Sequence, residues 1–206
     1  MRVYEGKTAE QRQSERRERL IGAATELFGT RGFGATSARA VLRQAGLQDR
    51  YFAESFENLP ELLAAVLDNI HAAAIADAVK AIDSSAPPLV QFRQMVAATT
   101  ACFELNPHWG RIKLVEALGV SPLVEAHRAR GLTEYANLVE GFLPPTSEAA
   151  QRPALARAVV SGVNGLLTDW ITGSFDEKRD DVVEHAALLF GGVLHAVQSP
   201  TGVPAK

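Results

Sequence analysis

The stretch GLQDRYFAESF at residues 46–56 is the most informative part of the chain. Gly46 is suited to end one helix in the left-handed backbone conformation, and the apolar Leu47 then turns the corner. A second, short helix is expected to follow over roughly residues 48–55. This helix–turn–helix geometry is the one that places a helix in the DNA major groove. The sequence therefore predicts a small DNA-binding unit within its first sixty residues.

Two helices are expected before this turn. The first spans about Ser14–Gly29, and the polar residues before it are expected to fray. Gly32 and Gly34 end it, because glycine adopts positive φ angles without steric cost. Thr36 or Ser37 then caps the second helix, which ends at the glycine of the turn. Four aromatic side chains are expected to form the core of this domain: Phe28, Phe33, Phe52 and Phe56.

A long amphipathic helix is expected from Asn58 to about Ile82. Asn58 is a good N-cap, and Glu61 three residues later completes a pair that resembles a capping box. Apolar residues then recur with the spacing of one helix face: Leu59, Leu62, Leu63, Val66, Leu67 and Ile70. Since a helix rises 1.5 Å per residue, this rod of roughly 35 Å would join the N-terminal domain to the rest of the chain.

The remaining sequence carries helix signals and no alternating run typical of a strand. Prolines preceded by a cap or another proline are expected to open or close helices at four places: Pro87-Pro88, Asn106-Pro107, Ser121-Pro122 and Pro144-Pro145. Two more helices are expected near Pro153–Thr172 and Phe175–Gln198, the second one capped by Ser174 and Glu177. Helical periodicity therefore extends through the whole chain.

These signals predict an all-α protein of about nine helices. We expect an N-terminal arm and helix–turn–helix domain at residues 1–57 and a helical bundle at residues 58–206, which would bind a ligand and form a dimer. A chain of 206 residues is long enough for two small domains with a sizeable core.

Composition fits a cytoplasmic protein, and also an exported protein without disulfides, and the charge distribution indicates that one end of the chain meets nucleic acid. The single cysteine, Cys102, excludes an internal disulfide, and no apolar run suits a signal peptide or a membrane span. Residues 1–56 carry 10 Lys/Arg against 7 Asp/Glu, whereas the rest carries 11 against 17. A basic end on an acidic body is expected if only that end contacts phosphates.

A gap-free series of motifs covers about residues 14–67. It comprises RRERLIGAATELF at 16–28, RGF at 31–33, ATS at 35–37, QAGL at 44–47, Phe56 and ELL at 61–63. This series resembles the TetR family of bacterial transcriptional regulators, and RYF at 50–52 with ESF at 54–56 looks like a variant found in actinobacterial members. The resemblance implies all-helical homodimers in which each N-terminal domain binds a DNA half-site. It also implies that a ligand in the body changes the spacing of those domains.

The resemblance places DNA contacts at the start of the second and third helices. Arg50 is suited to guanine O6 and N7, Gln48 to adenine N6 and N7, and Tyr51 to a thymine methyl group or a phosphate. Hydroxyls at a helix N-terminus suit a phosphate. The expected contact set is Thr36, Ser37, Arg39, Gln48, Asp49, Arg50, Tyr51 and Ser55. Arg16 and Arg17 either follow the DNA backbone or form an ordinary exposed charged face.

An effector site is expected to be mostly apolar with a few polar groups. Six residues are candidates for it, each of which ordinary core packing also explains: Phe92, Thr99, Phe103, Trp109, Tyr135 and Trp170. The expected effector is a small hydrophobic molecule of unknown identity. Small residues of the last two helices are expected to pack across a two-fold axis, with packing of the same face within one chain as the alternative: Ala154, Ala158, Gly162 and Gly165 with Ala186, Ala187 and Gly191.

The sequence lacks the patterns of enzymes and metal proteins. The histidines show no metal-ligand spacing, and no nucleophile–base pair or phosphate loop is present, so neither a cofactor nor a metal is expected. The interpretation that fits best is a ligand-responsive transcriptional regulator, a repressor, that binds a near-palindromic operator in double-stranded DNA as a dimer. A dimeric helical small-molecule binder with degenerate DNA reading is the alternative. In the family that the chain resembles, Ala53 stands where an aromatic residue usually contacts a phosphate and Leu59 where a lysine or arginine does, and Glu54 adds negative charge.

Overall fold

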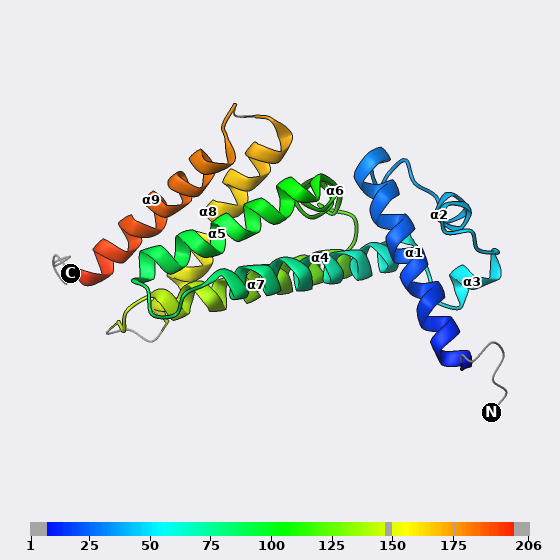
Figure 1. Cartoon of the computed structure of the whole chain (residues 1–206), viewed down its shortest axis with the longest axis horizontal. Coiled ribbons are helices and arrows are strands. Elements are labelled where there is room, and N and C mark those ends of the chain that lie inside the picture. The colour runs from blue at the N-terminus through cyan, green and yellow to red at the C-terminus, as the bar shows by residue number, and fades with distance from the viewer. Residues whose placement is uncertain (1–7, 147–149, 175, 200–206) are drawn as a thin grey trace. The chain divides into compact units, whose positions relative to one another are not determined.

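The computed structural model describes residues 8–146, 150–174 and 176–199, and this part of the chain is helical throughout, without a strand (Figure 1). Its elements are α1 (Ala9–Arg31), α2 (Ala38–Ala45), α3 (Arg50–Ala53), α4 (Leu59–Ala81), α5 (Pro88–Leu105), α6 (Pro107–Arg111), the π-helical turn η1 (Ile112–Glu116), α7 (Pro122–Phe142), α8 (Gln151–Thr172) and α9 (Arg179–Gln198). The predicted all-α class with about nine helices is confirmed.

The chain forms two compact units. The first comprises Met1–Ile70 and Pro107–Arg128, and the second comprises His71–Asn106 and Ala129–Lys206. The elements α1, α2 and α3 belong to the first unit and α5, α8 and α9 to the second, whereas α4 and α7 contribute residues to both. The functional boundary after residue 57 stays a prediction.

Helix α1 begins earlier than the predicted Ser14. The Thr8 hydroxyl accepts a hydrogen bond from the Gln11 backbone N at 3.1 Å, and Gln11 Oε1 accepts one from the Thr8 backbone N at 2.7 Å. This capping box satisfies two donors that a helix start otherwise leaves unpaired, and so it extends the helix through polar residues. The expectation of fraying was therefore wrong for residues 9–13, while residues 1–7 lie outside the described part.

Helix α1 buries its apolar face against α2 and the aromatic residues of the domain. Leu20 and Phe28 are fully buried, and the Phe28 ring lies 5.3 Å from the ring of Phe33 between centroids. Phe52 and Phe56 are also buried, with their ring centroids 6.1 Å apart. The predicted aromatic core is thus formed, although Phe33 is only half-buried at its edge.

Helix α2 has the ends that the sequence predicted. Ser37, rather than Thr36, is its N-cap, since the Ser37 hydroxyl accepts a hydrogen bond from the backbone N of Ala40 at 3.3 Å. Gly46 ends the helix with φ 63° and ψ 40°, the left-handed conformation that favours glycine. The backbone N of Leu47 then donates to the Leu42 carbonyl at 2.9 Å, which fixes the direction in which the chain leaves.

Helix α3 is a single turn, Arg50–Ala53, rather than the predicted helix over residues 48–55. The Asp49 side chain makes no capping hydrogen bond at its start. At its end the Phe52 carbonyl accepts from the backbone N atoms of both Ser55 and Phe56, at 2.9 and 2.8 Å. This tight turn carries Phe56 into the core, and burial of that ring outweighs the gain from one more helical turn.

Helix α4 confirms the predicted amphipathic rod. Asn58 Oδ1 accepts from the backbone N of Glu61 at 2.9 Å, while Glu61 Oε2 accepts from the backbone N of Glu57 at 2.6 Å. Among the described helices, α4 alone is long and apolar enough to cross a membrane by those two criteria. However, 56% of its most apolar window is buried inside the protein, and Leu62 and Leu63 are fully buried, as in the core helix of a soluble protein.

In the second unit α9 packs against both α5 and α8 (Figure 1). Phe92 of α5 stacks on Phe190 of α9, with 4.4 Å between ring centroids and 12° between ring planes. Phe142 of α7 meets Phe190 edge-on at 6.5 Å. At the surface Arg179 Nη1 lies 3.1 Å from Glu104 Oε2 and joins the ends of α9 and α5. Aromatic packing therefore holds three helices of this unit together.

The start of α9 differs from the predicted one. Asp181 Oδ2 accepts a hydrogen bond from the backbone N of Lys178 at 3.1 Å, so Lys178 and Asp181 occupy the capping positions. The cap predicted at Ser174 and Glu177 was wrong, because an acidic residue in the first turn beyond them binds the free backbone donor. Phe175, where the helix was expected to begin, lies outside the described residues.

Candidate DNA-binding interface and effector site

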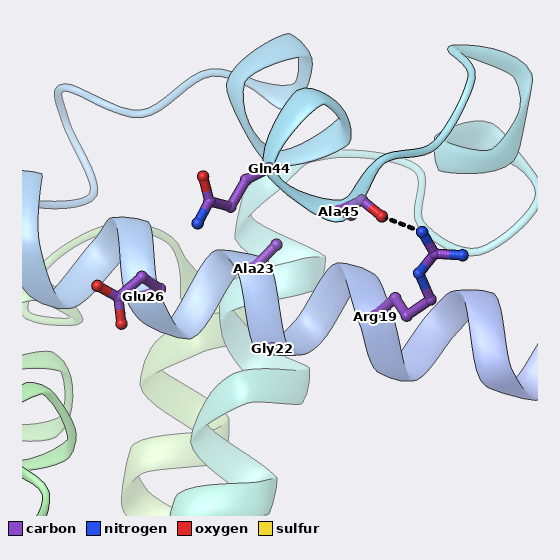
Figure 2. A pocket seen from close by; sticks show the side chains of 6 residues that line it. All are labelled: Arg19, Gly22, Ala23, Glu26, Gln44 and Ala45. Atoms are coloured by element: carbon purple, nitrogen blue, oxygen red, sulfur yellow. Dashed lines mark hydrogen bonds between the residues drawn. The ribbon is translucent and has the colours of Figure 1, made fainter.

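Helix α2 is tied to α1 at its carboxyl end. Arg19 of α1 donates from Nη2 to the backbone carbonyl of Ala45 and, at 3.3 Å, to that of Gly46 (Figure 2). A guanidinium at a helix C-terminus satisfies carbonyls that have no partner within the helix and interacts favourably with the helix dipole. Arg19 therefore fixes the point at which the chain turns from α2 toward α3.

A shallow pocket of about 290 Å³ lies beside this contact, between α1 and α2 (Figure 2). Its lining residues are Arg19, Gly22, Ala23, Glu26, Gln44 and Ala45. No pattern in the sequence pointed to it. Half of its lining residues are polar or charged and the other half are glycine or alanine, so it offers no large apolar side chain to a hydrophobic effector.

Most of the residues that are predicted to contact DNA have exposed side chains. The side chains of Ser37, Arg39, Gln48, Asp49 and Arg50 are exposed. Tyr51 and Ser55 are half-buried at the edge of the aromatic core. The turn after α2 and the first turn of α3 therefore present an exposed polar row, residues 48–50, which is the arrangement that base recognition requires.

Thr36 differs from the other predicted contacts. Its side chain is 7% exposed, and its hydroxyl donates to the backbone carbonyl of Gly32 at 2.8 Å. The side chain thus closes the turn between α1 and α2 instead of facing outward. This geometry argues against a DNA contact from the Thr36 side chain and leaves Ser37 as the exposed hydroxyl at the start of α2.

Tyr51 is surrounded by two guanidinium groups. The Cζ atom of Arg16 lies 4.5 Å from the Tyr51 ring centroid, and that of Arg50 lies 4.7 Å from it, both within the range of cation–π attraction. Arg50 Nη2 also donates to the Tyr51 hydroxyl at 2.8 Å. This hydrogen bond raises the pKa of Arg50 above its usual value, and Glu54 adds a smaller electrostatic contribution in the same direction.

The structure also joins α1 to the segment after α3, which no sequence motif indicated. Arg16 Nη2 lies 3.2 Å from Glu54 Oε2, and Gln13 Nε2 donates to the Glu54 backbone carbonyl at 3.4 Å.

Arg16 and Arg17 had two interpretations in the sequence, a contact with the DNA backbone or an ordinary exposed charged face. In the structure the guanidinium of Arg17 lies over the Phe56 ring, with Cζ 4.8 Å from its centroid.

Five of the six predicted effector residues belong to the second unit, and Trp109 belongs to the first. Phe92 and Phe103 are fully buried in the second unit, where Thr99 and Tyr135 form a polar pair with 3.2 Å between their hydroxyl oxygens. Thr99 also donates to the Met95 carbonyl at 3.0 Å, so Tyr135 is the donor within the pair. Trp170 of α8 is partly exposed in the same unit, whereas Trp109 of α6 belongs to the first unit and is partly exposed there. The effector role of these six residues stays a prediction.

Burial of Tyr135 predicts a loss of stability at alkaline pH. Burial raises the pKa of Tyr135 from 10.0 to about 12, so only the unfolded chain ionises this hydroxyl between those values. The contribution of the neutral Tyr135 hydroxyl to the free energy of unfolding is complete below pH 10. It is lost as the pH rises to 12, by about 2–3 kcal/mol at most. We expect Tyr135→Phe to lose about 0.5–1.5 kcal/mol at neutral pH and to show a flatter decline above pH 10. Urea denaturation at pH 8, 10 and 11.5 measures both effects, and an unchanged alkaline slope in the variant would contradict this assignment.

No group of three or more His, Cys, Asp or Glu side chains suited to a metal ion occurs in the described parts of the chain.

Comparison with known protein families identifies the N-terminal part. Residues 20–66, which include α2, α3 and the start of α4, match the family model of the bacterial regulatory proteins of the tetR family. Residues 20–66 therefore carry the N-terminal domain of this family. The resemblance of the motifs at residues 14–67 is thereby confirmed. Members of this family are transcriptional regulators that carry a helix–turn–helix DNA-binding domain.

Solved structures share the fold of this chain. A transcriptional regulator from Rhodococcus sp. Rha1 superposes with a TM-score of 0.75 at 17% identity, over 89% of this chain and 98% of that chain. The regulator FadR from Bacillus subtilis, in complex with stearoyl-CoA, has a TM-score of 0.72 at 15% identity, over 84% and 96%. The fatty acid degradation regulator FadR from Bacillus halodurans has a TM-score of 0.71 at 13% identity, over 86% and 96%. No curated protein sequence matches the chain significantly.

Proposed function

We propose that this TetR-family regulator is a ligand-responsive repressor that binds a near-palindromic operator as a homodimer. The observation that carries the proposal is the exposed row of Gln48, Asp49 and Arg50, which follows the helix end at Gly46 inside the family-matched domain. A two-fold dimer presents two such rows, so half-sites about one helical turn apart, or a multiple of it, are expected. A regulator of chromosomal DNA acts in the cytoplasm.

We propose that the homodimer forms through α8 and α9. Four small residues of α8 are exposed and would allow a partner helix to approach closely: Ala154, Ala158, Gly162 and Gly165. Leu188 and Leu189 of α9 are also exposed. Ala186 and Ala187, which were expected in this interface, are buried within the chain, because the side of α9 that carries them packs on its own unit. Gly191 is half-buried.

The effector is proposed to be a small hydrophobic molecule that binds to the second unit. The Tyr135 and Thr99 hydroxyls lie in a region with the fully buried Phe92 and Phe103, which is the composition expected of such a site. FadR from Bacillus subtilis binds stearoyl-CoA, so fatty acyl chains are one class of compound to test. An effector acts only through different affinities for the DNA-competent and incompetent states. We assign the transmission to α4, which contributes residues to both units.

A dimeric small-molecule binder with degenerate DNA reading is the second candidate. Asp49 and Glu54 place negative charge beside the predicted contacts, and the exposed Ala53 offers no group to a phosphate. Selection from a random duplex library separates the two functions. We expect the purified chain to enrich a near-palindromic sequence, and recovery of unselected sequences only would favour the second candidate. A thermal-shift screen of hydrophobic compounds identifies the effector class under both functions.

Arg50→Ala is expected to weaken binding to the selected duplex by roughly 5- to 150-fold for each half-site. The reason is that a bidentate arginine–guanine contact is worth about 1–3 kcal/mol of discrimination. Fluorescence anisotropy with the selected duplex and with one substituted at the contacted base measures this loss. Arg43→Ala is the matched control, since Arg43 is an exposed arginine at the opposite end of α2 from its N-cap. An equal loss in both variants would show that Arg50 contributes charge alone.

A further inference from the structure

The ion pair between Arg16 and Glu54 lies beside the predicted recognition residues. Its atoms Nη2 and Oε2 are 3.2 Å apart, with side chains that are 22% and 43% exposed. The Arg16 guanidinium also lies over Tyr51, which Arg50 contacts from its own position on α3. Two cations and one carboxylate thus share a small surface of the first unit, at the side chains that are expected to meet DNA.

A carboxylate and a phosphate bind arginine in the same way. Both present oxygen pairs to the planar guanidinium fork, with short charge-assisted hydrogen bonds. Glu54 therefore holds Arg16 through the contact that a DNA phosphate would use. Because duplex DNA carries phosphates at high density, Arg16, which is partly exposed, can exchange the carboxylate for a phosphate.

We propose that Glu54 is an internal competitor of the DNA backbone, and that Arg16 is a phosphate contact which Glu54 occupies in the free protein. This inference rests on the proposed function and adds two residues to the interface. Binding to DNA then breaks the Arg16–Glu54 pair. The cost of breaking it weakens the binding of every duplex by the same factor, whatever its sequence. Glu54 lowers the affinity and leaves base discrimination to Arg50 and Gln48.

The ion pair is not the only connection between α1 and α3. Gln13 donates to the backbone carbonyl of residue 54, which any side chain at this position retains. Phe52 and Phe56 anchor the same segment in the core. Glu54→Gln therefore removes the negative charge and leaves these anchors in place, so the variant is expected to fold.

The test measures binding to a fluorescein-labelled duplex of mixed sequence, because a phosphate contact requires no operator. We expect Glu54→Gln to bind about two- to fivefold more tightly than the unsubstituted chain at low salt, the range typical of an exposed ion pair. Glu57→Gln is the matched control, since Glu57 is an exposed glutamate three residues further along the chain. The control corrects for the general effect of removing one negative charge near DNA.

A double-mutant cycle with Arg16→Gln assigns the effect to the pair. In the Arg16→Gln background we expect Glu54→Gln to have no larger effect than Glu57→Gln. Arg16→Gln alone is expected to reduce the salt slope of log K by about 0.9 for each N-terminal domain bound, the value for one phosphate contact. Equal gains from both glutamate variants, an unchanged salt slope, or no duplex binding by any variant would overturn the inference. Failure of the operator selection with these results intact would overturn only the sequence-specific function.

Discussion

Phe190→Ala is expected to lower the free energy of unfolding by about 3–5 kcal/mol. Phe190 is fully buried and stacks on Phe92 while it meets the edge of Phe142, so one side chain joins α9 to α5 and α7. Its removal leaves a cavity beside the rings of Phe92 and Phe142, which are themselves buried. Those rings cannot move fully into the space, and the lost contacts add to the lost burial.

Urea denaturation followed by far-UV circular dichroism measures this loss. Leu188→Ala is the control on the same helix, because Leu188 is 70% exposed and its truncation in a single chain is expected to cost less than about 0.5 kcal/mol. The comparison is made at a protein concentration where both variants have the same association state. A loss below 1 kcal/mol for Phe190→Ala would mean that the three helices are held by other contacts.

Helix ends could be predicted from the sequence where the cap is a single residue with one strong preference. Gly46 ends α2 and Asn58 caps α4 as expected, and Pro88 opens α5. The starts of α1 and α9 were missed, because polar sequence offers several possible caps a few residues apart. The choice among them depends on which carboxylate or amide reaches a free backbone donor, and that depends on how the segment is packed.

The candidate site shows the same division. The exposure of Gln48 and Arg50 follows from their place after a helix end, so the motif predicted it. The burial of Thr36 does not, since Thr36 and Ser37 are neighbours with similar chemistry and only the turn geometry decides which one faces outward. The contact of Glu54 with Arg16 joins residues far apart in the chain, and no local pattern encodes it.

Effector residues are the least predictable part. Helical periodicity assigns a residue to an inner face but does not say whether that face meets core or cavity. Phe92 illustrates this limit, since its ring stacks on Phe190, which is the contact of a core residue. Tyr135 and Thr99 were recognisable as polar groups on apolar faces, yet their pairing depends on the packing of α7 against α5.

Leu188→Glu is expected to convert the proposed dimer into a monomer and thereby to abolish tight operator binding. Leu188 lies on the exposed side of α9, and the adjacent Leu189 packs on Gly162 of α8. In a two-fold interface each substitution occurs twice, so two buried leucines are lost and two carboxylates are brought together. We expect the dimer dissociation constant to rise by about 100-fold or more, since each buried leucine contributes roughly 1.5–3 kcal/mol.

Sedimentation velocity over a range of concentrations measures dissociation, and anisotropy with the selected duplex measures its consequence. A monomer contacts one half-site, so operator affinity is expected to fall when the dimer dissociates, whereas each N-terminal domain keeps its fold. Leu118→Glu is the control, because Leu118 is an exposed leucine outside α8 and α9. A Leu188→Glu chain that remained a dimer would place the interface on another surface. A monomer that kept full operator affinity would show that tight binding does not need two recognition rows on one duplex. The reason for expecting a near-palindromic operator would then be gone.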